Sequence, residues 1–217
     1  MSNFILYKAL MLRRTAIVFA TLIIGFVIFA VSVFRSADAK YSFAGEPSPF
    51  PDSQKKIEIN YSLAYPGRIA PDSPLWSLKA VRDRIWIAAT FNSLKKSEVL
   101  LLMADKRIQQ AQVLFETDKT SLGVSTLTKA EKYLKEAKKQ ELVARGQKEN
   151  TVNFLERLAN SALKHRQITE YILKIAPEEA KPEIIKTMDY SKKVFEDSRN
   201  SLIDVGKTAP DNPFEEQ

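Results

Sequence analysis

Residues 16–34 read AIVFATLIIGFVIFAVSVF, a run of nineteen residues that contains no charged side chain. An α-helix rises about 1.5 Å per residue, so this run reaches roughly 28 Å, close to the ~30 Å hydrocarbon core of a bilayer. The run therefore predicts a transmembrane helix over residues 15–35. If it is retained, every other part of the chain is tethered to a membrane.

A cleaved secretory signal is the alternative interpretation. Lys8, Arg13 and Arg14 precede the run, and Ala37-Asp38-Ala39 offers a small-x-small motif, so the chain would be secreted after cleavage following Ala39. Two features oppose cleavage: the run is longer than the usual core of a signal peptide, and Arg35 lies between the run and the motif. We therefore expect an uncleaved signal anchor.

The basic residues also predict the orientation in the plasma membrane. Three of them precede the span and two follow it closely, and Lys and Arg concentrate on the cytoplasmic side of a membrane. We expect residues 1–14 to form a cytoplasmic stub. Residues 36–217 would then lie outside the cytoplasm, and a cleaved signal would send them to the same side.

Charge and cysteine content exclude several classes of function. The chain has a net charge of +7 and a pI near 9.4, but residues 1–35 hold four basic and no acidic residues, which leaves only +3 for residues 36–217. We therefore expect no nucleic-acid partner. The chain has no cysteine, which excludes disulfides, thiolate metal sites and a cysteine nucleophile.

The rest of the chain divides into a spacer and a helical domain. Residues 36–73 contain five of the ten prolines and predict an extended spacer. Residues 74–206 then predict an all-α bundle of about five helices, because apolar residues recur every three or four positions. The expected helices lie near 74–90, 93–117, 121–145, 151–175 and 182–205. The polar residues 207–217 predict a disordered tail.

The first expected helix carries the candidate interaction residues. Its buried stripe is expected to contain Leu75, Leu78, Val81, Ile85 and Ala88. Trp86 falls at the edge of this stripe, and Trp76 projects to the other side. There Trp76 could clamp the turn Tyr65-Pro66-Gly67 of the spacer or contact an outside partner. The candidate interaction or spacer-clamp residues are therefore Tyr65, Pro66, Gly67, Trp76 and Trp86.

No catalytic residue, metal site or cofactor is predicted. The sequence has no Gly-rich phosphate loop, no Gly-x-Ser-x-Gly and no His-Glu-x-x-His. His165 is the only histidine, falls on or near an apolar stripe, and is expected to be a packed or boundary residue. Glu131 and Lys135 are four residues apart, and we expect them to form an ion pair on a helix surface.

Several segments resemble a family of bacterial domains of unknown function. The segments Tyr65-Pro66-Gly67, Pro71-Asp72-Ser73-Pro74-Leu75, Leu78-Lys79 and Arg82-Asp83-Arg84-Ile85 resemble the opening of that domain. The runs Ala104–Arg107 and Lys129–Leu134 are similar to its second and third helices, so the resemblance covers roughly residues 61–144. It implies a membrane-anchored, exported helical protein of the bacterial envelope. It transfers no activity and no site residue.

Two functions of different class remain. The favoured one is a non-catalytic, membrane-tethered helical interaction module outside the cytoplasm, a scaffold, adaptor or chaperone-like bundle with a protein partner in the envelope. The alternative is a helical domain that binds or processes a cell-wall polymer or a small envelope ligand. Buried carboxylates around His165 or the tryptophans would favour the second, and an apolar core with charges only on outer faces would favour the first. The oligomeric state stays open.

Overall fold

The computed structural model describes residue 11, residues 18–21, residue 25 and residues 58–215, and it separates the chain into two compact units, residues 1–41 and 42–217. The described residues of the first unit are helical, and the Thr21 hydroxyl donates to the Val18 carbonyl at 2.9 Å. Within the described residues, none of the helices has the length and apolar character needed to cross a bilayer. Most of the predicted span lies outside these residues, as do the cleavage motif and the proline cluster of the spacer.

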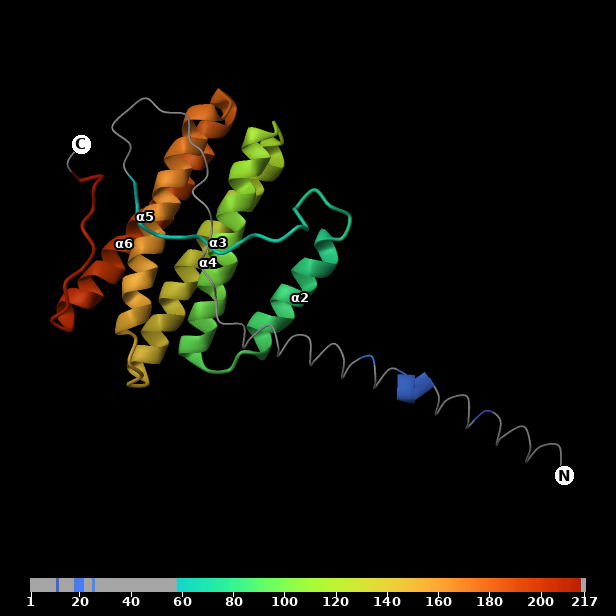
Figure 1. The fold of residues 1–217 in the computed structure, drawn as a ribbon, viewed down its shortest axis with the longest axis horizontal. Helices are drawn as coiled ribbons and strands as arrows, with labels where there is room; N and C mark the ends of the chain where they lie inside the picture. The colour runs from blue at the N-terminus through green and yellow to red at the C-terminus, as the bar shows by residue number, and fades with distance from the viewer. Residues whose placement is uncertain (1–10, 12–17, 22–24, 26–57, 216–217) are drawn as a thin grey trace. The chain divides into compact units, whose positions relative to one another are not determined.

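The described part of the second unit is all-α, as predicted, with no strand among its residues. Its elements are α2 (Trp76–Ala89), α3 (Ser93–Glu116), α4 (Thr120–Gly146), α5 (Val152–Ile175), the short 3-10 helix η1 (Glu178–Ala180) and α6 (Lys181–Asp204) (Figure 1). The five α-helices begin and end within two residues of the positions that the apolar periodicity gives.

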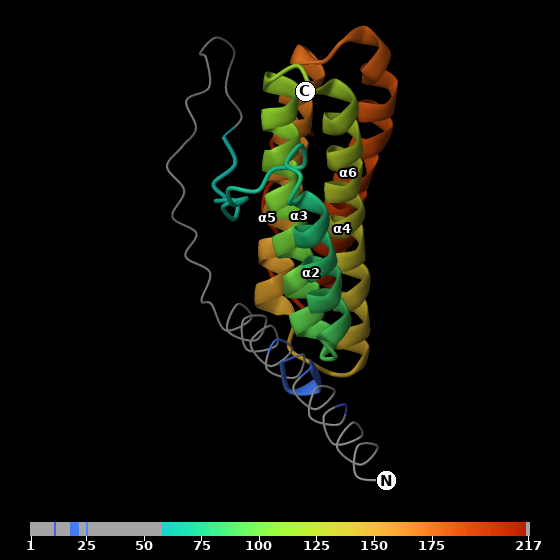
Figure 2. The same cartoon turned by 90° about the vertical axis from the view of Figure 1, so that its right-hand side faces the viewer.

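The four longest helices form a bundle, and α2 lies on its outside (Figures 1 and 2). Helix α3 lies beside α4 and α5, and α6 lies beside the same two helices. The helices of the bundle have 24 to 27 residues, which corresponds to a length of about 36 to 40 Å. Helix α2, with 14 residues, packs on α3.

Local chemistry explains where several helices begin and end. The Asn92 side chain caps α3 by accepting a hydrogen bond from the Lys95 amide at 2.8 Å. Pro182 stands in the first turn of α6, where its missing amide hydrogen costs nothing. Gly206 follows α6 with a φ of 70°, a conformation that is unstrained only for glycine.

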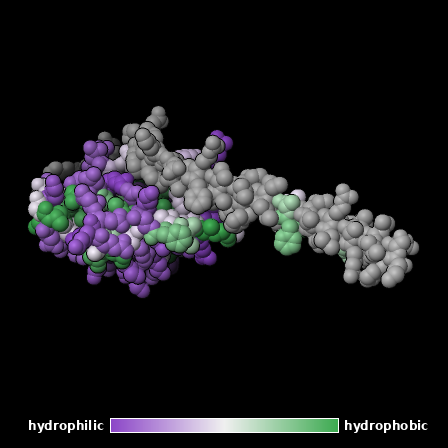
Figure 3. Space-filling view, turned by 90° about the horizontal axis from the view of Figure 1, so that it is seen from below, coloured by the Kyte–Doolittle hydropathy of each residue, from purple (hydrophilic) through white to green (hydrophobic). Residues whose placement is uncertain are grey.

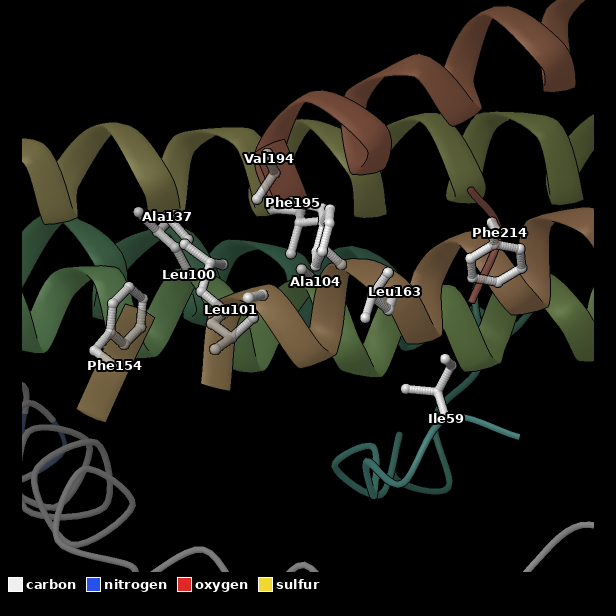
Figure 4. Packing of buried hydrophobic residues seen from close by; sticks show 14 residues of the cluster. Ile59, Leu100, Leu101, Ala104, Ala137, Phe154, Leu163, Val194, Phe195 and Phe214 are labelled. Carbon is white, nitrogen blue, oxygen red and sulfur yellow. The ribbon is translucent and has the colours of Figure 1, made fainter. Parts of the chain in front are cut away.

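The core of the bundle consists of two adjoining apolar clusters. The first contains leucines of α3 and α5 together with Phe154, Val194 and Phe195 (Figure 4). The second is centred on Ile108, Leu127, Ile172 and Ile184, which are 0% exposed. Helices α3 and α4 approach closely at Gly123, where a Cβ atom would lie 2.9 Å from the Phe115 ring.

The residues before α2 pack on the bundle. Residues 58–73 form neither helix nor strand, and their backbone runs across α3 and α5. Ile59, Leu63 and Ala64 are buried, and Ile59 lies at the edge of the first cluster in Figure 4. This end of the predicted spacer is therefore attached to the bundle by its apolar residues.

The prediction of a disordered tail is wrong for the described residues up to 215. Phe214 is 8% exposed and belongs to the first apolar cluster. The guanidinium of Arg166 lies 4.2 Å from the centroid of its ring. A large apolar side chain thus returns an otherwise polar tail to the bundle.

The predicted buried face of α2 is also wrong. The residues of the predicted stripe are exposed: Leu75, just before the helix, by 57%, Leu78 by 70%, Val81 by 51% and Ile85 by 42%. Asp83 and Trp86 face the bundle instead, at 2% and 7% exposure. Both faces of this helix carry apolar residues, so periodicity alone does not identify the inner one. The inner face offers the larger Trp ring and an acid that pairs with Arg107 of α3.

Candidate functional site

A chain of buried polar groups runs through the bundle around His165. Its Nδ1 lies 2.8 Å from Glu131 Oε1 of α4, and its Nε2 lies 3.3 Å from Asp105 Oδ1 of α3. Asp105 also accepts hydrogen bonds at 2.7 Å from the hydroxyls of Tyr61 and Ser161. The network therefore joins α3, α4 and α5 to the segment that precedes α2.

The electrostatics of this network favour a charged histidine. Burial alone lowers the pKa of His165, but the carboxylates of Glu131 and Asp105 outweigh it and raise the pKa to about 9. At neutral pH both ring N–H groups then donate, one to each carboxylate. Burial and the neighbouring Asp105 raise the pKa of Tyr61, which keeps its hydroxyl protonated as a donor.

The network is sealed from solvent. His165 and Glu131 are 0% exposed and Asp105 is 1% exposed. The prediction of a packed histidine agrees with this burial, but the predicted surface pair of Glu131 with Lys135 is wrong, because Glu131 faces inward to His165. Two acids around one imidazolium are suited to holding three helices in register, since separating any of them would leave a buried charge unpaired.

A second buried network lies near the C-terminal end of α4. Lys138 donates to Glu141 Oε2 at 2.6 Å and to the Ser201 hydroxyl of α6 at 3.0 Å. The Thr151 hydroxyl donates to the other Glu141 oxygen at 2.7 Å. Glu141 is 0% exposed. Its partners thus fix α6 and the start of α5 to α4.

The most open arrangement of charged groups is a small cleft between α2 and α3. Its walls contain Trp76, Lys79, Arg82, Asp83, Met103, Lys106, Arg107 and Gln110. Four of these side chains are cationic and one is acidic. The volume of about 10 Å³ is close to the space that one water molecule needs.

Arg107 is the centre of this cleft. Its guanidinium lies 5.0 Å from the centroid of the Trp76 ring and 5.1 Å from that of Tyr133, and 3.9 Å from Asp83 Oδ2. Arg82 donates to the other oxygen of Asp83 at 2.7 Å. The Nε of Arg107 is buried and makes no hydrogen bond to another described residue. These contacts hold α2 on α3 through charge and aromatic stacking.

The lysines of the cleft are poorly hydrated. Burial lowers the pKa of Lys79 to about 8, although Asp83 opposes the shift. Burial also lowers the pKa of Lys106. Lys79 donates to the carbonyl oxygens of Pro66 and Ile69, both at 2.9 Å, and so holds the segment before α2 against the helix.

The outward face of α2 is defined here as Leu78, Val81 and Ile85. These residues recur at three and four positions, so they form one stripe on the side opposite Asp83 and Trp86. Arg82 and Arg84 flank the stripe, and Phe91 follows the helix with 92% of its side chain exposed. In Figure 3, hydrophobic residues interrupt a largely hydrophilic surface of the bundle.

The five candidate residues from the sequence have different environments. Tyr65 is 72% exposed, and the Pro66 carbonyl accepts hydrogen bonds from Lys79 and Gln110. Gly67 has a φ of 80°, so it makes a turn that favours glycine. Trp76 is half-buried in the cleft and Trp86 is buried. Lys79 and Gln110 hold the Tyr65-Pro66-Gly67 turn through its Pro66 carbonyl, while Trp76 stacks with Lys79 and Arg107.

Sequence reasoning missed the buried acids Asp83, Asp105, Glu131 and Glu141. For two of these acids, the position in the sequence already indicated burial. Asp105 ends the apolar run Val99–Ala104, and Glu131 lies four residues after Leu127, on the buried stripe of its own helix. Charged residues at stripe positions indicate internal ion pairs, and His165 on the stripe of α5 is the matching cation.

Comparison with known proteins identifies the family of this fold. No curated protein and no solved structure matches the chain. A family model described as "Domain of unknown function (DUF5667)" matches residues 68–179, which is 112 of the 217 residues. This match includes α2 to α5, the cleft and most of the network around His165. The chain therefore belongs to the family of domains of unknown function DUF5667.

Proposed function

We propose that the chain is a non-catalytic, membrane-tethered helical interaction module of the bacterial cell envelope, with its bundle outside the cytoplasm. The observation that carries this proposal is the outward face of α2. Three large aliphatic side chains lie in one stripe and are between 42% and 70% exposed. Exposed aliphatic side chains that recur on one face of an ordered helix form a candidate contact site.

The contacts of α2 explain why this face is available. The helix is held on α3 from its other side, by Trp86 in the interface and by the ion pairs of Asp83. The outward face belongs to neither apolar cluster of the bundle. An outside partner can therefore bind it without unfolding any described element.

The uncharged run over residues 16–34 supports the tether. With the cytoplasmic stub inside, the bundle would project from the outer side of the plasma membrane. The networks around His165 and Glu141 fit a module of this kind, because they fix the positions of the helices that support α2.

Photo-crosslinking in intact cells tests this function. A photoreactive amino acid would replace Val81 on the outward face of α2 in the full chain. A matched control would replace Ile203 on α6, which has a similar exposure of 54%. We expect one envelope component to be captured at position 81 and not at position 203. Equal capture at both positions, or none at 81, would contradict a contact site on α2.

One observation favours the second candidate function, the binding of a small anionic ligand. Carboxylates do gather around His165, and the cleft at Trp76 is lined by four cations, two of them with a lowered pKa. The cleft, however, is lined by none of His165, Asp105 and Glu131. Any ligand of the cleft would thus meet Trp76, four cations and the buried acid Asp83, and not the acids of the network. In this structure the cleft has room for about one water molecule, so a larger ligand requires it to open.

Binding of an envelope polymer or anion by the purified full chain would test this second function. Soluble cell-wall fragments and inorganic phosphate are suitable probes. Binding that Lys106→Gln weakens, combined with no partner at position 81, would replace the interaction module by a ligand-binding domain. The exposed Lys193→Gln on α6 is the control for a general loss of positive charge.

A further inference from the structure

The charge of the exported part of the chain is concentrated around α2. Residues 68–96 contain six basic and two acidic residues, a net charge of +4, whereas residues 36–217 as a whole carry +3. The rest of this part is therefore close to neutral. Of the two acids, Asp83 is buried and Asp72 is paired with Lys119. Because Arg82 pairs with Asp83, the exposed Arg84 supplies the positive charge of the α2 surface, and Arg68, Lys95 and Lys96 add charge in the flanking segments.

The outward half of α2 carries the residue types that contact a membrane interface. The outward face carries Leu78, Val81 and Ile85, and arginines lie on both of its sides. Phe91 is 92% exposed just beyond the C-terminal end of the helix. Apolar residues on one face, cations at its borders and an exposed aromatic residue favour the boundary between lipid headgroups and acyl chains.

A second copy of the chain is a poor match for this face. If two α2 helices packed face to face, Arg82 and Arg84 of both copies would come together. The only acid of α2 is Asp83, which lies on the opposite side at 2% exposure and already pairs with Arg82 and Arg107. The like charges would repel each other across such an interface.

We infer that the outward face of α2 docks on an anionic lipid bilayer, with Leu78, Val81 and Ile85 at the acyl-chain boundary and Arg84 at the lipid phosphates. This inference rests on the proposed function and names the component that the contact site binds. An anionic bilayer supplies both features that a partner of this surface needs: negative charge for the arginines and an apolar layer for the aliphatic stripe.

The tether makes such docking effective even if the free helix would bind weakly. Residues 35–57 separate the predicted span from the first continuously described residues and can extend over at most about 80 Å. A chain of this length keeps the bundle within reach of the membrane surface. Binding then becomes an intramolecular step with a high effective concentration.

The absence of cysteine allows a direct test with the full chain. A nitroxide spin label would be attached at Val81→Cys, and at Ile203→Cys as a control of similar exposure. Each protein would be reconstituted into vesicles of phosphatidylcholine alone or of phosphatidylcholine mixed with phosphatidylglycerol. Collision rates with oxygen, which concentrates in lipid, and with a nickel chelate, which stays in water, report where the label lies.

We expect the label at position 81 to become accessible to oxygen and shielded from nickel in the anionic vesicles, while the label at 203 stays in water. Arg84→Glu, which changes the charge of an exposed residue by two, should weaken docking about thirty-fold at roughly 1 kcal/mol per charge near such a surface. Lys193→Glu on α6 makes the same change of charge on another helix and should leave docking unchanged.

Five results would overturn the inference. A water-exposed label at 81 in both kinds of vesicle would show that α2 does not dock. Equal shielding in neutral and anionic vesicles would contradict recognition of lipid charge, and spin–spin broadening that grows with protein density would point to a second copy. A protein captured at position 81 in cells would leave the proposed function standing with a different partner. Loss of the chain from vesicles after alkaline extraction would contradict the membrane tether, and with it both the proposed function and the docking of α2.

Discussion

Raising the pH should destabilise the bundle, because it removes the proton that His165 shares with two buried carboxylates. The pKa of this buried histidine is about 9 in the folded chain, against an ordinary value of 6.5. Between these two pH values only the folded chain holds the proton. The contribution to stability is therefore fully present below pH 6.5 and is lost as the pH rises toward 9.

The magnitude follows from the same pair of values. The difference between 9 and 6.5, at 1.36 kcal/mol for each pH unit, gives about 3 kcal/mol in total. About 2 kcal/mol of this should be lost between pH 5.5 and pH 8. The upper limit of pH 8 matters because burial lowers the pKa of Lys79 to about 8. Above that pH the unfolded chain binds more protons at this lysine, which opposes the effect of His165.

Urea unfolding of the full chain in detergent measures this effect. Fluorescence of the two tryptophans reports the packing of α2, and far-UV circular dichroism reports the bundle. His165→Gln is the control, because glutamine keeps a hydrogen-bond donor but has no charge to lose. At pH 5.5 this variant should be about 3 to 5 kcal/mol less stable than the original chain, since it leaves two buried acids without their cation.

The dependence on pH distinguishes the role of the charge from simple loss of packing. The original chain should lose stability between pH 5.5 and 8. In His165→Gln the two unpaired acids can take up protons themselves, so the control for the pH dependence combines Asp105→Asn, Glu131→Gln and His165→Gln and should be nearly insensitive to pH in this range. The same slope in the original chain and in this triple variant, or a rise in stability with pH in the original chain, would refute a protonated His165 between Asp105 and Glu131.

Three further predictions concern the packing of the bundle. Phe195→Ala should lower the free energy of unfolding by about 3 to 5 kcal/mol, because Phe195 is 3% exposed. The control Ile203→Ala, at a residue 54% exposed, should change it by no more than about 0.5 kcal/mol. Equal urea midpoints for the two variants would show that Phe195 is not part of the core. Tyr61→Phe should cost about 1.5 to 3 kcal/mol by removing the 2.7 Å hydrogen bond to Asp105, and an unchanged midpoint would mean that the segment before α2 is not held there. Gly123→Ala should lower the thermal midpoint. A Cβ atom 2.9 Å from the Phe115 ring costs about 1 to 3 kcal/mol of stability, whereas the gain in helix propensity is at most about 1 kcal/mol. A higher midpoint would show that α3 and α4 can accommodate the added methyl group.

The helices were predictable because each carries a strong periodic pattern. Leu127, Ala130, Leu134 and Ala137 of α4 lie on one stripe, and all are 0% exposed. Asn92, Pro182 and Gly206 mark helix ends by local backbone chemistry that does not depend on the rest of the fold. These signals act within a few residues, so a sequence displays them directly.

The candidate site was less predictable because its contacts join distant residues. Asp105 meets His165 across 60 positions and Tyr61 across 44 positions. Spacing within one helix favours a surface pair of Glu131 with Lys135, but the environment of Glu131 is decided by α5, which brings a cation to its inner side. The buried charge is acceptable only in the assembled bundle, where each acid finds its partner.

The sequence by itself determined the periodic helices, their ends, the absence of cysteine chemistry and the uncharged run over residues 16–34 that predicts the anchor. Only the tertiary structure decided which side of α2 faces inward. That helix has apolar residues on both sides, so its rotation depends on what α3 offers to it, namely Arg107 for Asp83 and a surface for Trp86. The predicted buried stripe of α2 thereby became an exposed face, and this reversal is the physical basis of the proposed contact with the membrane.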